Sequence, residues 1–224
     1  MTLPAVLLLM VGLAPSRADE PDQWPVVFAD DFESGAISQW MATDPQAWRL
    51  AAEREQHFLQ QFAASRVQNA VRSPFNRAIV SGLVVGDFQL DVDVRSTARD
   101  YPHRDVCLFF GYQDPTHFYY VHLGQRADDH ANQIFIVHEA PRVKISTRST
   151  EGTPWNSDWH HVRIIRHAES GEIAVYFNDL QEPVMTASDK TFAWGTFGVG
   201  TFDDTADFDN VLLRGVRVDR PASR

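Results

Sequence analysis

The chain has 224 residues, of which 44% are hydrophobic and 22% are charged, and it carries one Cys and a formal charge of -10. The apolar share is too high for intrinsic disorder, and 12 Gly and 12 Pro are too few for a collagen-like or low-complexity chain. One Cys excludes an internal disulfide and gives no support to a zinc or iron–sulfur site built from several thiolates. The acidic balance argues against nucleic acid and anionic lipid as partners and favours a neutral ligand or a cation.

The N-terminal segment is predicted to be an export signal. Residues 1–14 are almost wholly apolar, and residues 16–18 (Ser-Arg-Ala) place small side chains where a signal peptidase cleaves. The apolar run is shorter than the ~20 residues of a membrane-spanning helix, and no later stretch approaches that length. Because residues 1–14 contain no Lys or Arg, a buried N-terminal strand or helix is the alternative. We therefore expect a signal peptide at 1–18, a single domain at 19–224, no membrane span, and a secreted or periplasmic product.

The segment of residues 48–65 fits either a helix or a pair of strands. Its Ala, Glu, Gln and Leu residues are good helix formers. A turn sequence, Asp44-Pro45, precedes it, and Trp48 to Leu50 and His57 to Phe62 fit two short strands joined by a charged turn. We expect strands, because tertiary context overrides propensity in such segments.

From residue 75 onward the chain has a strand pattern. Phe88, Leu90, Val92 and Val94 alternate with polar residues, as in a strand with one buried face. Further strands are predicted at 106–112, 117–123, 133–138, 159–166, 172–178, 197–202 and 208–218, with 159–166 and 172–178 paired as a hairpin. Because no long amphipathic helix separates them, the sequence predicts an all-β, antiparallel sandwich or barrel.

Three motifs add a family resemblance to this pattern. They are FADDFESG from residue 28, GYQDPTHFYYVHL from residue 111, and GTFGVGTF from residue 195 followed by FDNVL from residue 208. They resemble the concanavalin A-like lectin/glucanase jelly rolls, and most closely the secreted bacterial keto-disaccharide hydrolase-like and laminin-G-like domains. The resemblance covers residues 26–218 and implies two facing antiparallel sheets whose concave face can hold a glycan. It does not select an activity, because the fold carries lectins, hydrolases, lyases and adhesion modules.

The same resemblance implies a structural calcium site that joins the chain ends. In lichenase-type jelly rolls the ligands are a backbone carbonyl just before the N-terminal Phe and an Asp of the last strand. The matching positions are Asp31, before Phe32, and Asp209. Calcium takes six to eight oxygen ligands, so these two positions supply only part of a shell. The alternative is that these acids cap turns on an acidic surface.

The candidate ligand site is a cluster of aromatic and polar residues in the middle strands and loops. Sugar recognition uses aromatic faces together with planar donors and acceptors. Alternation puts Tyr120 and His122 on the face opposite the more apolar Tyr119, Val121 and Leu123, which predicts that the first two point to the concave surface. Tyr120 and His122 are therefore the candidate catalytic residues, and the candidate substrate-binding residues are Arg104, Tyr112, His130, Asn132 and Arg142. The alternative is ordinary sheet aromatics with solvated His.

Several chemistries suit such a cluster. A polysaccharide lyase needs a Tyr or His base and an Arg, Asn or His that neutralises a carboxylate, and a hydrolase needs two carboxylates. Asp91 and Asp93 are about 7 Å apart along one strand face, yet the Glu residues of the glucanase signature are missing there, which favours a solvated face with Arg95 as counter-charge. Zinc held by three histidines (His122, His130 and His138) is a lesser possibility, because their spacing is not a known ligand pattern.

The tryptophans also divide between core and surface. Trp40, Trp48, Trp159 and Trp194 are expected to fill the core, and Trp155, in a Gly-Thr-Pro-Trp-Asn loop, is expected to be exposed. Taken together, the sequence predicts an exported jelly roll that binds, and in one alternative cleaves, a polysaccharide or oligosaccharide. A structural or adhesion module of the cell envelope is the third alternative.

Overall fold

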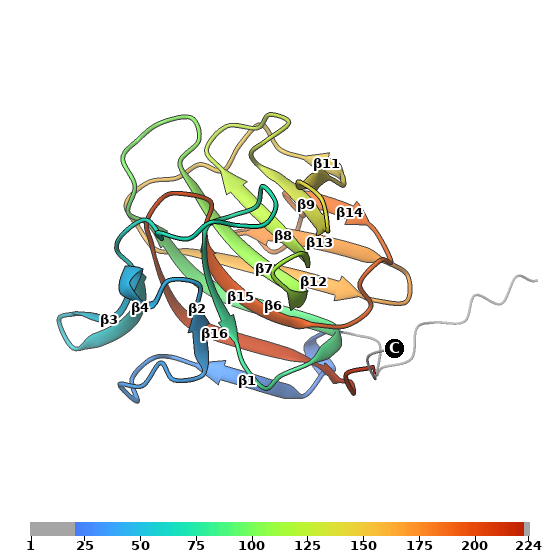
Figure 1. The fold of residues 1–224 in the computed structure, drawn as a ribbon, viewed down its shortest axis with the longest axis horizontal. Coiled ribbons are helices and arrows are strands. Elements are labelled where there is room, and N and C mark those ends of the chain that lie inside the picture. The colour runs from blue at the N-terminus through green and yellow to red at the C-terminus, as the bar shows by residue number, and fades with distance from the viewer. Residues whose placement is uncertain (1–20, 222–224) are drawn as a thin grey trace, which may run out of the picture.

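The computed structural model describes residues 21–221, which form two antiparallel β-sheets packed against each other (Figure 1). No α-helix occurs in this part of the chain, which has two 3₁₀ turns, η2 (Pro21–Gln23) and η3 (Pro45–Ala47). No helix within residues 21–221 has the length and apolar character needed to cross a membrane. The predicted signal peptide at 1–18 lies outside the described residues.

The larger sheet has nine strands in the order β11-β14-β13-β12-β6-β16-β4-β3, with β1 also paired to β16. The smaller sheet has seven strands in the order β10-β9-β8-β7-β15-β5-β2. The strands of the nine-stranded sheet are β1 (Val26–Asp30), β3 (Trp48–Glu53), β4 (Gln56–Gln61), β6 (Val85–Ser96), β11 (Ser146–Ser149), β12 (His160–His167), β13 (Glu172–Phe177), β14 (Met185–Ser188) and β16 (Ala206–Arg217). Those of the seven-stranded sheet are β2 (Trp40–Ala42), β5 (Asn76–Val80), β7 (Asp105–Asp114), β8 (His117–Gly124), β9 (Gln133–His138), β10 (Val143–Lys144) and β15 (Thr196–Thr201).

The structure confirms the all-β, antiparallel sandwich predicted from the sequence. The ambiguous segment 48–65 contains two strands, β3 and β4, which pair with each other. The predicted hairpin is β12 with β13. The short strands β1, β2, β5, β10, β11 and β14 were not predicted, because two to five residues are too few to establish an alternating pattern.

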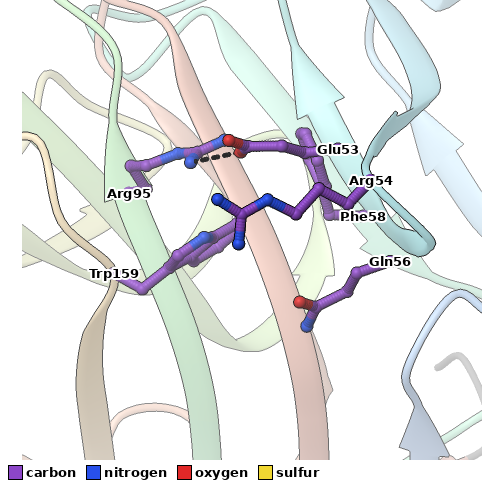
Figure 2. A pocket seen from close by; sticks show the side chains of 6 residues that line it. All are labelled: Glu53, Arg54, Gln56, Phe58, Arg95 and Trp159. Atoms are coloured by element: carbon purple, nitrogen blue, oxygen red, sulfur yellow. Dashed lines mark hydrogen bonds and ion pairs between the residues drawn. The ribbon is translucent and has the colours of Figure 1, made fainter.

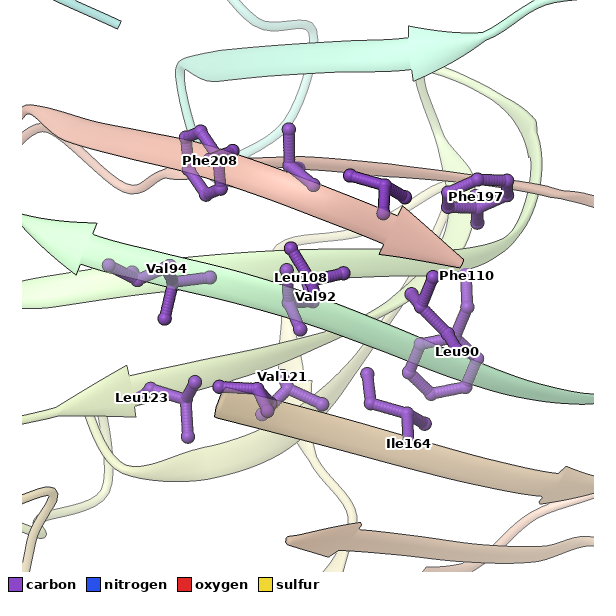
Figure 3. Packing of buried hydrophobic residues seen from close by; sticks show 14 of the residues in the cluster. Leu90, Val92, Val94, Leu108, Phe110, Val121, Leu123, Ile164, Phe197 and Phe208 are labelled. Carbon is purple, nitrogen blue, oxygen red and sulfur yellow. The ribbon is translucent and has the colours of Figure 1, made fainter. Parts of the chain in front are cut away.

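The core lies between the two sheets and is built from alternate residues of each strand (Figure 3). Leu90, Val92 and Val94 of β6 point toward the seven-stranded sheet, and Leu108 and Val121 come from that sheet to meet them. All five side chains are fully buried. Each such burial contributes about 1.5–3 kcal/mol, so the period-two pattern fixes which face of every strand points inward.

Strand β16 occupies a central place in the nine-stranded sheet. One of its edges pairs with β6. Its other edge pairs with β4 through residues 206–208 and with β1 through residues 211–214. The last strand of the chain therefore holds together elements from the beginning and the middle of the sequence.

Candidate functional site

The outer face of the seven-stranded sheet carries the predicted residues Tyr120 and His122. Alternation along β8 places Tyr119, Val121 and Leu123 in the core and Tyr120 on the opposite face, as predicted. This outer face is not the open groove that we expected, because a second apolar cluster covers most of it. The cluster consists of Ile79, Cys107, Phe109, Phe118, Tyr120, Phe135, Val137 and Phe202, with Val71, Phe75 and Tyr112 packed against it. The segment between β4 and β5 and the turn after β15 supply the covering side chains, and Tyr120 is fully buried.

A hollow of about 310 Å³ lies on this face, beside the turn that follows β15. Three of the predicted residues, His122, His130 and Arg142, line it together. The remaining lining residues are Arg72, Tyr101, His103, Asp105, Phe202 and Asp203. The sequence therefore identified part of a real cluster, in which side chains from β7, β8 and five loops meet.

Arg142 connects this hollow to the buried aromatic cluster. Its guanidinium carbon lies 4.2 Å from the ring centroid of Phe202 and 4.9 Å from that of Phe135. One nitrogen donates to the Tyr120 hydroxyl at 3.1 Å and another to the carbonyl oxygen of His130 at 3.0 Å. Cation–π contacts and hydrogen bonds thus fix the Arg142 side chain, and they link the buried Tyr120 hydroxyl to the hollow.

Asp105 and His122 form the buried floor of the hollow. The His122 Nε2 atom lies 3.4 Å from Asp105 Oδ2, and the two side chains are 5% and 0% exposed. Burial, followed by the nearby Arg142 charge, lowers the pKa of His122 to about 3, so the imidazole is neutral at ordinary pH. Burial and the neighbouring Asp204 raise the pKa of Asp105 well above its usual range. Both shifts favour the neutral form, so the floor is polar but carries little charge.

Two other predicted residues, Arg104 and Tyr112, lie outside this hollow. Arg104 is buried, and it donates to the hydroxyl and carbonyl oxygens of Ser96 and to the carbonyl oxygen of Asn156. Tyr112 stacks on Phe118 at a centroid distance of 5.4 Å and lines a different hollow. Arg104 therefore connects the end of β6 to the loop that contains Asn156, and Tyr112 packs against the apolar cluster on the outer face of the seven-stranded sheet.

Asn132 and Trp155 hold loops in place. Asn132 is fully buried with a φ of 54°, and its amide donates to the Thr150 carbonyl and accepts from the Thr153 hydroxyl. The expectation that Trp155 is exposed is wrong: it is 8% exposed, belongs to the core, and donates through Nε1 to the Leu123 carbonyl at 2.9 Å. A loop tryptophan that finds a carbonyl acceptor buries its apolar surface at no cost in unpaired polar groups.

The two positions expected to bind calcium, Asp31 and Asp209, already have protein partners. Asp31 is exposed, and its carboxylate accepts from the Glu33 amide at 3.2 Å. Asp209 is buried and accepts from Gln56 Nε2 at 2.8 Å and from the Asn210 amide at 2.7 Å. Neither belongs to a group of three His, Cys, Asp or Glu ligands among residues 21–221. These contacts concern the two carboxylates and not the backbone carbonyl before Phe32, so the calcium site stays a prediction.

The three histidines considered for zinc do not meet. His138 pairs with His117 at one end of the β8–β9 ladder, whereas His122 pairs with Gln133 at the other end. Two groups of close ligand atoms do occur in the described part of the chain: Asp105 with Cys107 and His122, and Asp105 with Asp203 and Asp204. Both share Asp105, the floor of the hollow.

A second hollow, of about 240 Å³, lies on the outer face of the nine-stranded sheet, and the sequence analysis did not identify it. It is lined by Glu53, Arg54, Gln56, Phe58, Arg95 and Trp159 (Figure 2). The hairpin of β3 and β4 supplies one wall, β6 supplies Arg95, and Trp159 immediately precedes β12. Trp159 is partly exposed and outside the core cluster, which corrects its predicted place in the core, and the same holds for Trp194. A signal was present in the sequence: Val162 and Ile164 face inward, so Trp159 had to face outward.

Aromatic and charged groups are fixed against one another in this second hollow. The Arg95 guanidinium lies 4.7 Å from the Trp159 ring centroid, and Phe58 meets Trp159 edge to face at 5.6 Å. Arg95 donates to Glu53 at 2.9 Å and, through two nitrogens, to Asp207 at 2.9 and 2.8 Å. The Arg95 hydrogen bond lowers the pKa of Glu53, which is therefore ionised. Phe58 and Arg95 thus hold the Trp159 ring in one orientation, and hydrogen-bonding side chains surround it.

The strand face beside this hollow is charged and internally paired. His161 donates through both ring nitrogens, from Nε2 to Asp91 at 2.9 Å and from Nδ1 to Asp93 at 2.8 Å. Arg163 also donates to Asp91 at 2.7 Å. The counter-charges of Asp91 and Asp93 are therefore His161 and Arg163, and not Arg95 as expected. Asp91 and Asp93 are therefore held in ion pairs and are not a free carboxylate pair.

The fold was compared with known proteins. No protein-family model matches this chain, and no curated protein is significantly similar to it in sequence. Solved structures do match. The carbohydrate-binding module CBM66 from Bacillus subtilis aligns with a TM-score of 0.54 and 21% identity, over 79% of this chain and 96% of that one. Domain 4 of AbnA, a GH43 extracellular arabinanase from Geobacillus stearothermophilus in complex with arabinotriose, aligns with a TM-score of 0.54 and 11% identity, over 88% and 95%.

A third structure, the GH43 protein BlXynB from Bacillus licheniformis, aligns with a TM-score of 0.56 and 11% identity, over 87% of this chain and 40% of that protein. At these identities the similarity concerns the fold, and it does not transfer any residue's role. The two-sheet topology and these neighbours agree with each other. The chain has the concanavalin A-like, jelly-roll β-sandwich fold that carbohydrate-binding modules and glycoside hydrolase domains share.

Proposed function

We propose that this protein is an exported carbohydrate-binding module that holds a neutral saccharide in the Trp159 hollow. The observation that carries the proposal is the partly exposed Trp159 ring, held by Phe58 and Arg95 and surrounded by hydrogen-bonding side chains. The apolar face of a sugar ring packs against an aromatic ring, and its hydroxyls require planar donors and acceptors at the rim. Arg54, Gln56 and Glu53 supply these groups.

The charge balance of the hollow favours a neutral ligand. Arg54 and Arg95 contribute two positive charges, and Glu53 and the adjoining Asp207 contribute two negative ones. A uronate would gain no net attraction from such a set, and the chain as a whole, at -10, repels it. The solved neighbours include a carbohydrate-binding module and a domain in complex with arabinotriose, which is consistent with a neutral sugar as ligand.

The proposal is tested by isothermal titration calorimetry of the protein with a panel of neutral oligosaccharides, including arabinotriose, and of uronic-acid oligosaccharides. We expect heat with at least one neutral sugar, and a Trp159→Ala variant that binds it about 30-fold more weakly, the loss of about 2 kcal/mol typical of a buried aromatic anchor. Trp194→Ala is the matched control, because Trp194 is also partly exposed but lines a different hollow. Binding that survives Trp159→Ala, or that fails in Trp194→Ala instead, contradicts the assignment.

A second candidate function is catalysis on an acidic polysaccharide in the hollow that contains His122, and one observation favours it. Two arginines, Arg72 and Arg142, line that hollow with the imidazoles of His103 and His130, and a lyase requires such groups around a uronate. The burial of Tyr120 removes one of the two bases proposed from the sequence from direct contact. Absorbance of unsaturated uronate during incubation with uronic-acid polymers tests for a lyase, and new reducing ends without that absorbance indicate a hydrolase. If neither assay detects a product, the protein binds saccharide without cleaving it. If the calorimetric titrations also give no heat, a structural or adhesion module is favoured.

A further inference from the structure

Three side chains with metal-binding atoms face one another below the hollow on the seven-stranded sheet. Asp105 and Cys107 are two residues apart on β7 and so share a face, and His122 is the cross-strand partner of Cys107 on β8. Their ligand atoms all lie within 4.8 Å of one another, and all three side chains are buried. Strand register alone therefore assembles one oxygen, one sulfur and one nitrogen ligand at a single point.

Two of the three separations between these atoms match the edges of a tetrahedral zinc site. Zinc binds Cys sulfur at about 2.3 Å and His nitrogen or carboxylate oxygen at about 2.0–2.2 Å, which gives sulfur–oxygen and nitrogen–oxygen edges of about 3.5 and 3.4 Å. Here Cys107 Sγ lies 3.3 Å from Asp105 Oδ2, and His122 Nε2 lies 3.4 Å from the same oxygen. The sulfur and the nitrogen are therefore each at the spacing from Asp105 Oδ2 that a shared cation requires, and all three ligand atoms lie within 4.8 Å of one another.

Polar atoms of the same residues lack hydrogen-bond partners. Both ring nitrogens of His122 and the Oδ1 atom of Asp105 are buried and make no well-aligned hydrogen bond, and the backbone of His130 is a polar group near the imidazole. A buried polar group without a partner costs about 1–3 kcal/mol, so an arrangement of this kind needs an explanation. His122 is only 4% exposed and lines the hollow, which gives a cation a route to the cluster.

We propose that Asp105, Cys107 and His122 bind a zinc-class divalent cation, with the fourth coordination position open toward the hollow. A thiolate combined with imidazole and a single carboxylate is a ligand set that suits zinc rather than calcium or magnesium. Binding replaces the proton that the Cys107 thiol shares with Asp105, and that proton is released to solvent. Asp203 and Asp204, grouped around the same Asp105, supply further negative charge for the cation, against the positive charge of Arg142. This proposal does not depend on saccharide binding at Trp159.

The test uses the full chain, reduced, stripped with a chelator, and reloaded separately with Zn²⁺ and with Co²⁺. We expect about one metal per chain after desalting, release of protons on binding, and a thiolate-to-cobalt charge-transfer band that only a Cys ligand produces. In the His122→Gln variant the dissociation constant should rise more than about 100-fold, beyond the range reached by loss of an outer-shell partner. Cys107→Ser should lose the charge-transfer band.

His138→Gln is the matched control, because His138 is exposed and lies at the far end of the same strand ladder. It should keep the stoichiometry and the band. Wild-type protein that is folded and binds less than a fifth of an equivalent, or that binds cobalt without a thiolate band, overturns the proposal, and a bound water then accounts for the buried polar atoms. The wild-type spectrum decides the matter even if the buried variants do not fold. Saccharide titrations of the stripped protein separate this outcome from failure of the proposed function.

Discussion

Titration of His161 should make the stability of this protein fall between neutral and alkaline pH. Hydrogen bonds to Asp91 and then to Asp93 raise the pKa of His161 from 6.5 to about 9. A group whose pKa is raised by folding stabilises the native state fully below its unfolded pKa, and that contribution disappears as pH rises through the folded pKa. The loss should therefore begin near pH 6.5 and be complete slightly above pH 9.

The size of the effect follows from the shift and from the exposure of the ring. The shift from 6.5 to about 9, at about 1.36 kcal/mol per pH unit, sets a ceiling of about 3.4 kcal/mol. The His161 side chain is 36% exposed, so solvent screens both contacts. We expect about 1 kcal/mol, the upper range for exposed ion pairs.

The assay is equilibrium unfolding in urea at intervals from pH 6 to pH 10, on the wild type and on His161→Gln. The wild type should lose about 1 kcal/mol of unfolding free energy over this range, and the variant should be less stable at pH 6 with a smaller slope. His103→Gln, which alters a ring contacting Asp128, serves as control and should keep the slope. An unchanged slope in His161→Gln, or an imidazole NMR titration of His161 near 6.5, would refute the reasoning.

Two further predictions concern buried polar anchors. Because Asn132 has a φ of 54°, Asn132→Ala should be less stable than Asn132→Gly by about 1 kcal/mol in urea unfolding; equal stability would show that the backbone is not strained there. The Tyr119 hydroxyl accepts from the Phe192 amide at 2.9 Å and donates to Asp189, so Tyr119→Phe should cost about 1–3 kcal/mol because that amide loses its partner. A neutral result in thermal and urea unfolding would mean that water replaces the hydroxyl.

The fold could be predicted from the sequence because it follows from the alternation of apolar and polar residues along each strand. The site could not, because it depends on which loop side chains cover the outer face of the sheet. Alternation along 117–123 assigned both faces of β8 correctly. It could not reveal that Phe202 and the segment before β5 lie over the outer face, since those residues follow no regular pattern and reach it through tertiary packing. The sequence therefore predicted the correct face of the sheet for Tyr120, but the prediction that its side chain is open to solvent was wrong.

The tryptophans show the same limit. Trp155 was expected to be exposed because of its loop, but a single carbonyl acceptor 32 residues away in the sequence draws it into the core. Trp159 was expected in the core because aromatics usually are buried, although its parity with Val162 and Ile164 already placed it outside. The hollow at Trp159 also needs the β3–β4 hairpin, a neighbour that no local pattern identifies.

The central position of β16 has a consequence for biogenesis. Asp30 near the start pairs with Val211 near the end, and β6 has no partner on one side until β16 arrives. The β3–β4 hairpin and β1 therefore cannot join the block of β6, β12, β13, β14 and β11 until β16 has been synthesised, and such non-local pairing folds slowly. The two halves of this sheet are therefore joined only when the last strand has been made.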